Sequence, residues 1–324
     1  MTTLPTFRLL RPTSVAEALE MRRANPESRF LAGGTDLIVN MRRGLVAPEA
    51  LIDLGGIGEM QRIEAMDGGL CIGAGVTLAH LIDHTGVSAG FPVLGAAART
   101  VAGPTHRETA TIGGNLCLET RCVYYNQSEW WRRANGYCLK NGGETCHVAP
   151  TGDRCHGAFS GDLAPVLLVM GAEAEIAGPD GTRTIPLADL YADDGAAHLR
   201  LGEGTILTAV HLPPSTARRA DYAKARVRGS VDFPLAGVAV ALAHDGGELR
   251  SLRVAVTGTN PRPLLVAETE SLAGAPLDED AIARLEKMVR KQIQPMRNTL
   301  SPGHYRRRVA AALAGRLARR LYHQ

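Results

Sequence analysis

The sequence predicts an α+β protein with more than one domain. Its 324 residues, 45% apolar and 21% charged, suit a folded chain of about two domains and exclude a disordered one. A capped helix followed by a short strand is expected near the N-terminus, and alternating strands followed by two amphipathic helices near the C-terminus. Separate helical and strand-rich segments of this kind are typical of α+β folds.

The N-terminal two thirds of the chain contain short elements that end at glycines. Ser14 and Glu17 have the spacing of a capping box, which predicts a helix over 15–21. Strands are expected at 28–31, before a double glycine, and at 69–75. The apolar run 162–170 is a buried helix or a buried strand, and its pattern alone leaves the two open.

The C-terminal third is predicted to be a separate unit. A break at 213–217, which begins with two prolines, supplies a linker. Strands are expected at 238–243 and 252–256. A helix should follow, with Ile282, Leu285, Val289 and Ile293 on one face. The last segment, 305–324, carries six arginines and no acid, which we interpret as a solvated helix face or a subunit contact.

The overall charge and hydropathy exclude several classes of protein. Lys and Arg number 36 and Asp and Glu 33, and a net charge of +3 does not favour nucleic-acid binding. No apolar run is long enough for a membrane helix, and residues 1–12 lack a secretory signal pattern. We therefore expect a cytoplasmic protein that binds neither nucleic acid nor membrane. In a reducing compartment, clustered cysteines indicate metal or redox chemistry rather than disulfides.

Two double-glycine turns are the first candidates for ligand binding. Glycines allow positive φ and close backbone approach, so successive N–H groups can converge on a phosphate. Neither turn matches the dinucleotide fingerprint or the phosphate-binding loop, and either one alone is also compatible with an ordinary tight turn. The first comprises Arg29, Phe30, Leu31, Ala32, Gly33, Gly34, Thr35 and Asp36, and the second Thr111, Ile112, Gly113, Gly114 and Asn115.

These turns resemble the two pyrophosphate loops of the FAD-binding medium subunit of the molybdenum hydroxylases, the xanthine dehydrogenase and carbon monoxide dehydrogenase relatives. The resemblance spans nearly the whole chain and implies that both turns bind FAD. It places Asp162, in the segment Gly161–Leu168, near the adenosine half of FAD, and Lys224 near the flavin. It also places Val101 against the cofactor. Tyr305–Arg307 matches a signature of the family's C-terminal helix.

The resemblance also implies the domain organisation. We expect the two-lobed FAD-binding domain of the CO-dehydrogenase flavoprotein type, with lobes at 1–55 and 56–212, and a C-terminal sheet-and-helix domain at 216–324. Each site residue has a structural alternative: Asp36 and Asp162 could cap helices, and Lys224 could be a surface lysine. No residue resembles a catalytic acid, base or nucleophile, so this chain is expected to conduct electrons.

A cysteine-rich insertion at about 119–160 separates the second glycine turn from Asp162. Its stretch 122–155 contains five of the chain's 14 aromatic residues, including Tyr124, Tyr125, Trp130 and Trp131, which either shield a metal centre or attach the insertion to its parent domain. Long irregular loops of this kind are uncommon unless they are functional. Four of the six cysteines fall within it, namely Cys122, Cys138, Cys146 and Cys155.

Four thiolates suit either tetrahedral zinc or a [4Fe-4S] cluster. The spacings of 15, 7 and 8 intervening residues match no common motif. We prefer the cluster because an insertion beside a flavin gains electron transfer from it, whereas the parent fold needs no further structural metal. His147 or His156 could replace one cysteine as a ligand, and four unliganded buried thiols are the remaining alternative. Cys71 and Cys117 are interpreted as small buried residues.

Within the family, the added cysteines resemble the beta subunit of 4-hydroxybenzoyl-CoA reductase. That resemblance implies a subunit that passes electrons from a ferredoxin through [4Fe-4S] and FAD. They would continue through a [2Fe-2S] small subunit to a molybdenum-cofactor large subunit, where an aromatic acyl-CoA is reductively dehydroxylated. One alternative is the FAD subunit of an oxidising molybdenum hydroxylase with structural zinc in the insertion. Another is a non-catalytic scaffold whose glycine turns bind nothing.

Overall fold

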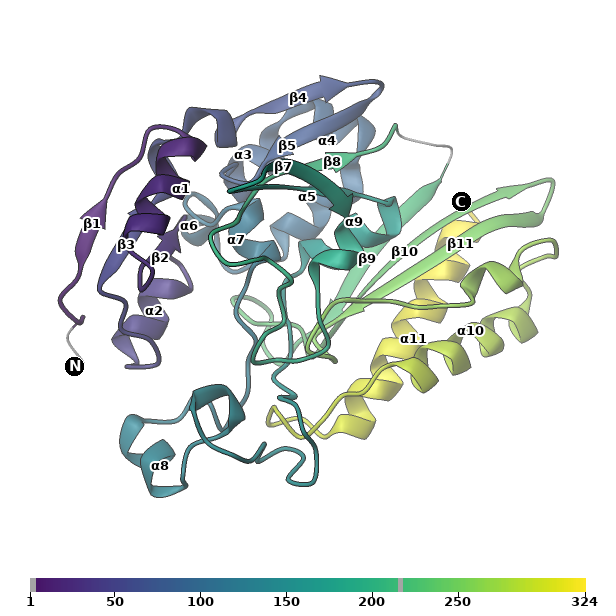
Figure 1. The fold of residues 1–324 in the computed structure, drawn as a ribbon. Helices are drawn as coiled ribbons and strands as arrows, with labels where there is room; N and C mark the ends of the chain where they lie inside the picture. Colours follow the sequence, from purple (N-terminus) through teal and green to yellow (C-terminus); the bar gives the residue numbers. More distant parts are fainter. Residues whose placement is uncertain (1–3, 215–217) are drawn as a thin grey trace.

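The computed structural model describes residues 4–214 and 218–324, and its helices and strands form three sheets with their covering helices (Figure 1). Within the expected linker, Ser215, Thr216 and Ala217 lie outside the described residues. The α+β fold class predicted from the sequence is confirmed. None of the described helices combines the length and apolarity needed to cross a lipid bilayer.

The first sheet is small and parallel, with strand order β1-β3-β2. Ser14 Oγ accepts a hydrogen bond from Glu17 N, which confirms the predicted cap of α1. The double glycine after β2 leads into α2. The elements are β1 (Arg8–Leu10), α1 (Val15–Ala24), β2 (Arg29–Leu31), α2 (Leu37–Arg42) and β3 (Ala50–Asp53).

The second sheet is antiparallel, with strand order β4-β5-β8-β6-β7, and most of its helices precede β6 in the chain. The run 162–170 forms a helix, α9, whose residues 163–169 are all buried. The strands are β4 (Ile63–Met66), β5 (Gly69–Gly73), β6 (Glu173–Gly178), β7 (Gly181–Pro186) and β8 (Ile206–Leu212). The helices are α3 (Leu78–Asp83), α4 (Thr85–Gly90), α5 (Pro92–Arg99), α6 (Pro104–Arg107), α7 (Ile112–Leu116), α8 (Glu129–Ala134) and α9 (Leu163–Met170).

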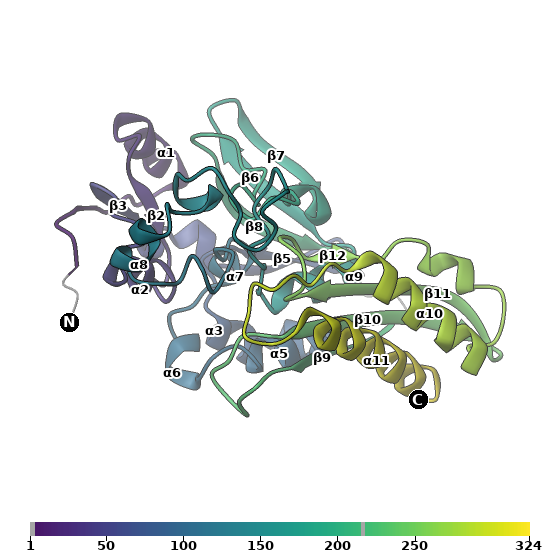
Figure 2. The same ribbon diagram turned by 90° about the horizontal axis from the view of Figure 1, so that it is seen from below.

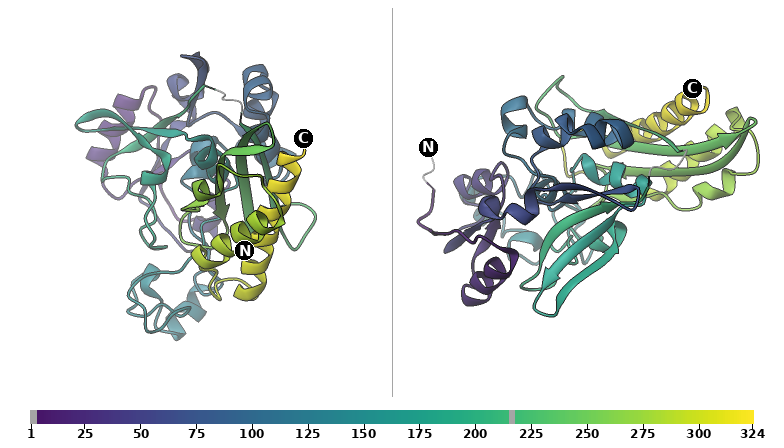
Figure 3. Two further views of the ribbon diagram at one scale, coloured as in Figure 1. Left: turned by 90° about the vertical axis from the view of Figure 1, so that its right-hand side faces the viewer. Right: turned by 90° about the horizontal axis from the view of Figure 1, so that it is seen from above.

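The third sheet is antiparallel, with order β12-β11-β10-β9, and two helices cover one of its faces (Figure 2). Its strands are β9 (Arg219–Ala225), β10 (Ala236–Asp245), β11 (Glu248–Thr257) and β12 (Leu264–Leu265). The helices are α10 (Glu279–Gln292) and α11 (Gly303–Tyr322). The strands β10 and β11 extend with α11 away from the rest of the molecule (Figure 3).

Alternation along β10 explains how this sheet packs on both faces. Val238, Val240 and Leu242 belong to the core beneath α10 and α11. Ala239 and Ala241 point to the opposite face and belong to the core that contains α9. Because successive side chains of a strand point to opposite faces, large residues fill one core and alanines allow close approach of α9 on the other.

Short 3-10 turns complete the chain, namely 54–56, 58–61, 139–141, 187–190 and 269–272. The cysteine-rich insertion between α7 and α9 contains little regular structure apart from α8, as its composition indicates. It lies below the main body in Figure 1. The insertion contacts the loop after α2, where Arg132 Nη2 donates to the carbonyl oxygen of Gly44 at 2.9 Å, and it also contacts Asn298 in the C-terminal part of the chain.

Candidate functional site

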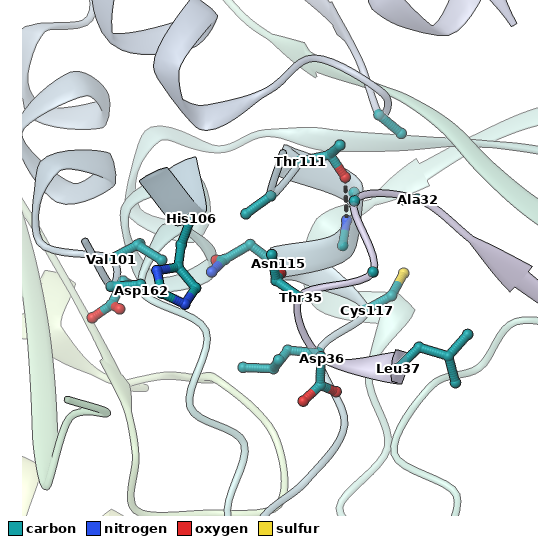
Figure 4. A pocket seen from close by; sticks show the side chains of 18 of the residues that line it. Ala32, Thr35, Asp36, Leu37, Val101, His106, Thr111, Asn115, Cys117 and Asp162 are labelled. Atoms are coloured by element: carbon teal, nitrogen blue, oxygen red, sulfur yellow. Dashed lines mark hydrogen bonds between the residues drawn. The ribbon is translucent and has the colours of Figure 1, made fainter. Parts of the chain in front are cut away.

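A cleft of about 470 Å³ lies between the two glycine turns (Figure 4). Its volume is in the range of cofactor pockets, and its wall combines apolar side chains with a few polar groups. The residues predicted to bind FAD that line it are Phe30, Ala32, Gly33, Gly34, Thr35, Asp36, Val101, Thr111, Gly113, Gly114, Asn115 and Asp162.

Gly33 brings the first turn against the chain that precedes the second turn. A Cβ atom on Gly33 would lie 1.8 Å from the carbonyl oxygen of Thr109, so no side chain fits there. Gly34 has φ of +71°, in the left-handed region that favours glycine. Glycine is therefore required at position 33 because the Thr109 backbone lies too close for a side chain, and it is favoured at position 34 because of the positive φ.

The second turn forms the beginning of α7. Thr111 Oγ1 accepts a hydrogen bond from Gly114 N at 3.0 Å, drawn as a dashed line in Figure 4. Asn115 Oδ1 accepts one from Leu163 N at 3.0 Å, so this amide caps α9 from outside the helix. Consecutive N–H groups at such a turn are suited to an anionic diphosphate.

Four of the predicted cofactor residues do not line the cleft. Arg29 is exposed and Leu31 half-buried on β2, while Ile112 is fully buried in the core. Their side chains are directed by the strand and the helix away from the cleft, so any contact with a ligand would come from their backbone. Lys224 lies behind the cleft wall, where it pairs with Asp162.

Asp162 does not cap a helix with its side chain. Its Oδ1 accepts a hydrogen bond from Tyr222 Oη at 2.5 Å and its Oδ2 one from Lys224 Nζ at 3.1 Å. Burial raises the pKa of the Asp162 carboxyl and lowers the pKa of Lys224, although each charge stabilises the other. Lys224 is thus a buried partner of the site and not a surface lysine.

Arg121 is a site residue that sequence reasoning missed. It lines the cleft with its side chain 14% exposed, and its guanidinium forms an ion pair with Asp36 and lies 5.1 Å from the ring centroid of Phe233. Asp36 likewise does not cap α2 with its side chain. The cleft wall also includes Arg228, Val231 and Asp232 from the loop between β9 and β10. No motif marks Arg121, because its proximity to Asp36 and Phe233 depends on segments far apart in the chain.

The four cysteines of the insertion line one small cavity. The other residues around it are Tyr124, Tyr125, Leu139, Lys140, His147, Val148 and Gly157. None of the six cysteines forms a disulfide. Cys122, Cys146 and Cys155 are buried and Cys138 is half-buried, so segments spread over 34 residues converge on one set of soft ligands.

Burial raises the pKa of the Cys155 thiol to about 11, and the pKa of Cys122 is raised for the same reason. These thiols are therefore protonated at neutral pH, and metal binding would release their protons. Among the described residues, no three His, Cys, Asp or Glu side chains are arranged to hold a metal ion. The four cysteines all line the same cavity.

Of the histidines and aromatic residues singled out in the insertion, some line the cysteine cavity and others do not. His147 lines the cysteine cavity, with Nε2 at 2.6 Å from the carbonyl oxygen of Tyr137, whereas His156 is not among the lining residues. Tyr124 and Tyr125 line the cavity. Trp130 is 78% exposed, so the expectation that it shields or attaches the insertion is wrong. It lies on the solvent face of α8, which is only six residues long.

The two cysteines outside the set were expected to be buried. Both are half-buried instead. Cys71 borders a separate polar pocket beside β5, and Cys117 lines the flavin cleft because α7 ends there. Neither lines the cysteine cavity.

Asn298 attaches both ends of the insertion to the C-terminal part of the chain. Its carbonyl oxygen accepts a hydrogen bond from Val123 N at 3.0 Å, and its Nδ2 donates to the carbonyl oxygen of His156. Arg306 Nη1 donates to Asn298 Oδ1 at 2.7 Å. Val123 and His156 follow Cys122 and Cys155 directly, so one buried amide fixes the spacing of two of the four cysteines.

The cleft and the cysteine cavity are adjacent. Arg121 lines the cleft, and the next residue, Cys122, lines the cavity. Consecutive Cα atoms across a trans peptide are about 3.8 Å apart. The two sites therefore meet the same stretch of backbone at Arg121 and Cys122.

Comparisons with known proteins agree with this geometry. Residues 5–215 match the family described as FAD binding domain in molybdopterin dehydrogenase, and residues 220–321 match the CO dehydrogenase flavoprotein C-terminal domain.

The chain is similar to curated proteins over most of its length. It is 33% identical over 318 residues to the aldehyde oxidoreductase FAD-binding subunit PaoB of Escherichia coli, covering 95% of this chain and 97% of the relative. It is 27% identical over 317 residues to the carbon monoxide dehydrogenase medium chain of Afipia carboxidovorans, covering 97% and 96%.

Among solved structures, a chain of the reconstituted CO dehydrogenase from Oligotropha carboxidovorans superposes with a TM-score of 0.81 at 27% identity, covering 99% of each chain. Together with the cleft and its glycine turns, these matches show that the chain belongs to the FAD-binding medium subunits of the molybdenum hydroxylase family.

Proposed function

We propose that this chain is an electron-transfer subunit that holds FAD in the cleft and a [4Fe-4S] cluster in the cysteine cavity of a molybdenum enzyme. The observation that carries the proposal is the adjacency of the two sites through Arg121 and Cys122. When bound, FAD exchanges one or two electrons and the cluster exchanges one, so neighbouring sites would relay electrons.

The residues of the cleft fit FAD. The backbone of both glycine turns is accessible at one cleft, where N–H groups would bind the diphosphate. Asp162 would meet the adenosine half, as the family resemblance implies, while Tyr222 and Lys224 hold its carboxylate in place. Arg121 would supply a fixed positive charge to the cleft.

The cysteine cavity favours a cluster over zinc. A single zinc ion binds each sulfur at about 2.3 Å, which requires four sulfurs around one point. The described side chains form no such arrangement, while all four cysteines face a shared cavity lined by aromatic and aliphatic groups. A centre that contains several iron atoms spaces its thiolates more widely, and a largely apolar lining would protect it from water.

The partners proposed are a molybdenum-cofactor large subunit and a [2Fe-2S] small subunit. The family membership supports this complex, because the related carbon monoxide dehydrogenase chain is itself named a medium chain. The carboxylates that line the cleft, Asp36, Asp162 and Asp232, are each paired with a basic side chain, and His106 and Cys117 also line it. The family membership supports conversion of the substrate on another subunit.

Metal analysis of the purified protein tests the proposal. About four iron atoms and four acid-labile sulfides per chain are expected, together with FAD released on denaturation. One zinc without sulfide would overturn the cluster. Cys138→Ser should abolish or weaken the cluster and leave FAD in place, whereas Cys71→Ser, outside the cavity, should retain both. If every variant that lacks the cluster also loses FAD, the insertion would form part of the FAD site instead.

For the overall reaction we propose reductive dehydroxylation of the 4-hydroxybenzoyl-CoA type, with a ferredoxin as donor. The cysteine-rich insertion supports this reductase reaction, because a cluster bound there would accept single electrons from the donor and pass them to FAD. The balanced step consumes two electrons and two protons and releases benzoyl-CoA and water. The second candidate is aldehyde oxidation with electrons flowing outward, which the 33% identity to the aldehyde oxidoreductase subunit supports.

Activity assays on the native complex distinguish electron flow toward the molybdenum site from electron flow away from it. After molybdenum, iron and flavin have been measured, the complex is supplied either with reduced ferredoxin and 4-hydroxybenzoyl-CoA or with an aromatic aldehyde and an oxidised acceptor dye. Benzoyl-CoA formation supports the reductase. Carboxylic acid formation without benzoyl-CoA supports the oxidising enzyme and rejects the reductase assignment.

A further inference from the structure

An ion pair between a buried lysine and a partly exposed glutamate lies beside the cysteine cavity. Lys140, itself a lining residue, has a side chain only 5% exposed, and its Nζ lies 2.5 Å from Oε1 of Glu119. Lysine is rarely buried unless paired, so this position is stabilised by specific contacts.

Several groups fix the ammonium beside the cavity. Lys140 Nζ donates to the carbonyl oxygen of Gly195 at 2.8 Å and to the hydroxyl of Thr120. It also lies 5.0 Å from the ring centroid of Tyr125, which lines the same cavity. Exposure of the ammonium to solvent would break its contacts with Thr120, Gly195 and Tyr125.

Glu119 occupies the other end of the pair, on the segment that joins the two sites. Leu118 lines the flavin cleft on one side of it, and Cys122 lines the cysteine cavity on the other. Its carboxylate also accepts a hydrogen bond from Thr120 N at 2.9 Å and lies 3.8 Å from His198 Nδ1. The positive end of the pair therefore borders the cysteine cavity, and the negative end lies on the connecting segment.

We propose that Lys140 and Glu119 set the reduction potential of the redox centre held by the four cysteines, with opposite signs. The inference rests on the proposed [4Fe-4S] cluster. Four thiolates already make such a centre anionic, and one-electron reduction by the flavin or an external donor adds a further negative charge. A fixed cation at the cavity wall stabilises the reduced form more than the oxidised form, and an anion does the reverse.

Burial makes the charge of Lys140 effective, whereas the Glu119 side chain is 33% exposed and its charge is screened more by water. Opposite charges near a site of low dielectric constant interact far more strongly than charges exposed to water. Because the lysine is nearer to the cavity than the glutamate, the pair acts on the centre as an oriented dipole. Lys140 and Glu119 are positioning residues in this role, since neither is proposed as a ligand.

The test is a redox titration of the purified protein, followed by the electron paramagnetic resonance signal of the reduced cluster. Lys140→Gln should shift the midpoint potential to more negative values, and Glu119→Gln to more positive values. Lys140→Arg should stay close to wild type, because it keeps the charge. Lys287→Gln, on the exposed face of α10, removes the same charge far from the cavity and should leave the potential unchanged.

The outcomes separate this inference from the proposed function. A wild-type protein without iron and sulfide rejects the proposed function itself, and this inference with it. A cluster whose potential is the same in Lys140→Gln, Glu119→Gln and wild type overturns the inference alone. If Lys140→Gln fails to retain its cluster, Glu119→Gln decides: a shift to more positive values supports the role of the pair, and no shift or a negative one overturns it.

Discussion

Lys224 on β9 donates a hydrogen bond to Asp162 at the start of α9, with 3.1 Å between Nζ and Oδ2 and both side chains at most 5% exposed. Asp162 lines the flavin cleft, whereas Lys224 belongs to the C-terminal sheet. A single buried ion pair therefore joins the cleft wall to the sheet that lies behind it.

Lys224→Met is expected to destabilise the protein and to lower its FAD content. Removal of one partner leaves the Asp162 carboxylate buried with only Tyr222 as a hydrogen-bond donor, which typically costs about 3–5 kcal/mol. Chemical denaturation measures the free energy of unfolding, and absorbance after denaturation measures bound FAD. The double variant Asp162→Asn/Lys224→Met should have a free energy of unfolding between those of Lys224→Met and wild type. If Lys224→Met alone is as stable as wild type, the ion pair does not stabilise the fold.

Gly114→Val should weaken FAD binding without preventing folding. A Cβ at Gly114 would lie 3.1 Å from Thr111 Oγ1, so this hydroxyl must move by a few tenths of an ångström, and the added side chain would stand at a residue that lines the cleft. A loss of affinity of at least about tenfold, or about 1.4 kcal/mol, is expected in a titration of apoprotein with FAD. Gly90→Ala, where a Cβ meets nothing within 4 Å, is the control. Unchanged affinity in a folded Gly114→Val protein would remove this turn from the site.

Asn298→Ala should lower iron retention more than FAD retention. The substitution removes one of the four hydrogen bonds of the Arg306 guanidinium and the Asn298 side-chain donor of the His156 carbonyl oxygen, at a cost of about 1–3 kcal/mol for a buried group left unpaired. Because His156 follows Cys155 directly, the position of this cysteine should loosen, while the backbone hydrogen bond from Val123 N is kept. Iron and flavin are measured after gel filtration. Asn135→Ala, in the same insertion but exposed, should behave as wild type.

His198 should make stability depend on pH near neutrality. Burial lowers the pKa of its imidazole below the usual 6.5, and the ring makes a hydrogen bond of 3.0 Å to the carbonyl oxygen of Leu118. In the unfolded chain the His198 ring therefore binds a proton near pH 6.5, whereas in the folded protein it binds one only at lower pH. Stability falls as the pH decreases through 6.5 toward the folded pKa, by at most about 1.4 kcal/mol per pH unit.

Thermal unfolding between pH 5.5 and 7.5 checks this dependence. The Tm of wild type should fall more steeply toward low pH than that of His198→Gln, which has no titrating ring. Parallel curves for the two proteins would show that His198 does not contribute to the pH dependence.

Local features of the site were accessible from the sequence. The backbone at Gly34 adopts a positive φ, and Ser14 caps α1, because both depend on residues adjacent in the chain. The alternation at 238–243 likewise produced a strand with two different faces. The run 162–170 could not be assigned, because an entirely apolar segment has the same pattern as a buried helix or a buried strand.

Other features depend on segments that meet only in the folded protein. Arg121 pairs with Asp36 and stacks on Phe233, which lie 85 and 112 positions away in the sequence. Asn298 holds the insertion from the far end of the chain. Trp130 was expected to be covered, yet it is exposed, because the residue that α8 buries is Arg132 and not Trp130.

The sequence by itself determined the fold class, the two glycine turns and the set of four thiols, since these follow from backbone preferences and residue chemistry within short stretches. Only the tertiary structure decided that both turns share one cleft, that the four thiols share one cavity, and that the two sites adjoin at Arg121 and Cys122. The physical reason is that packing of the lobes and the C-terminal sheet fixes these long-range distances, and local conformational preference carries no information about them.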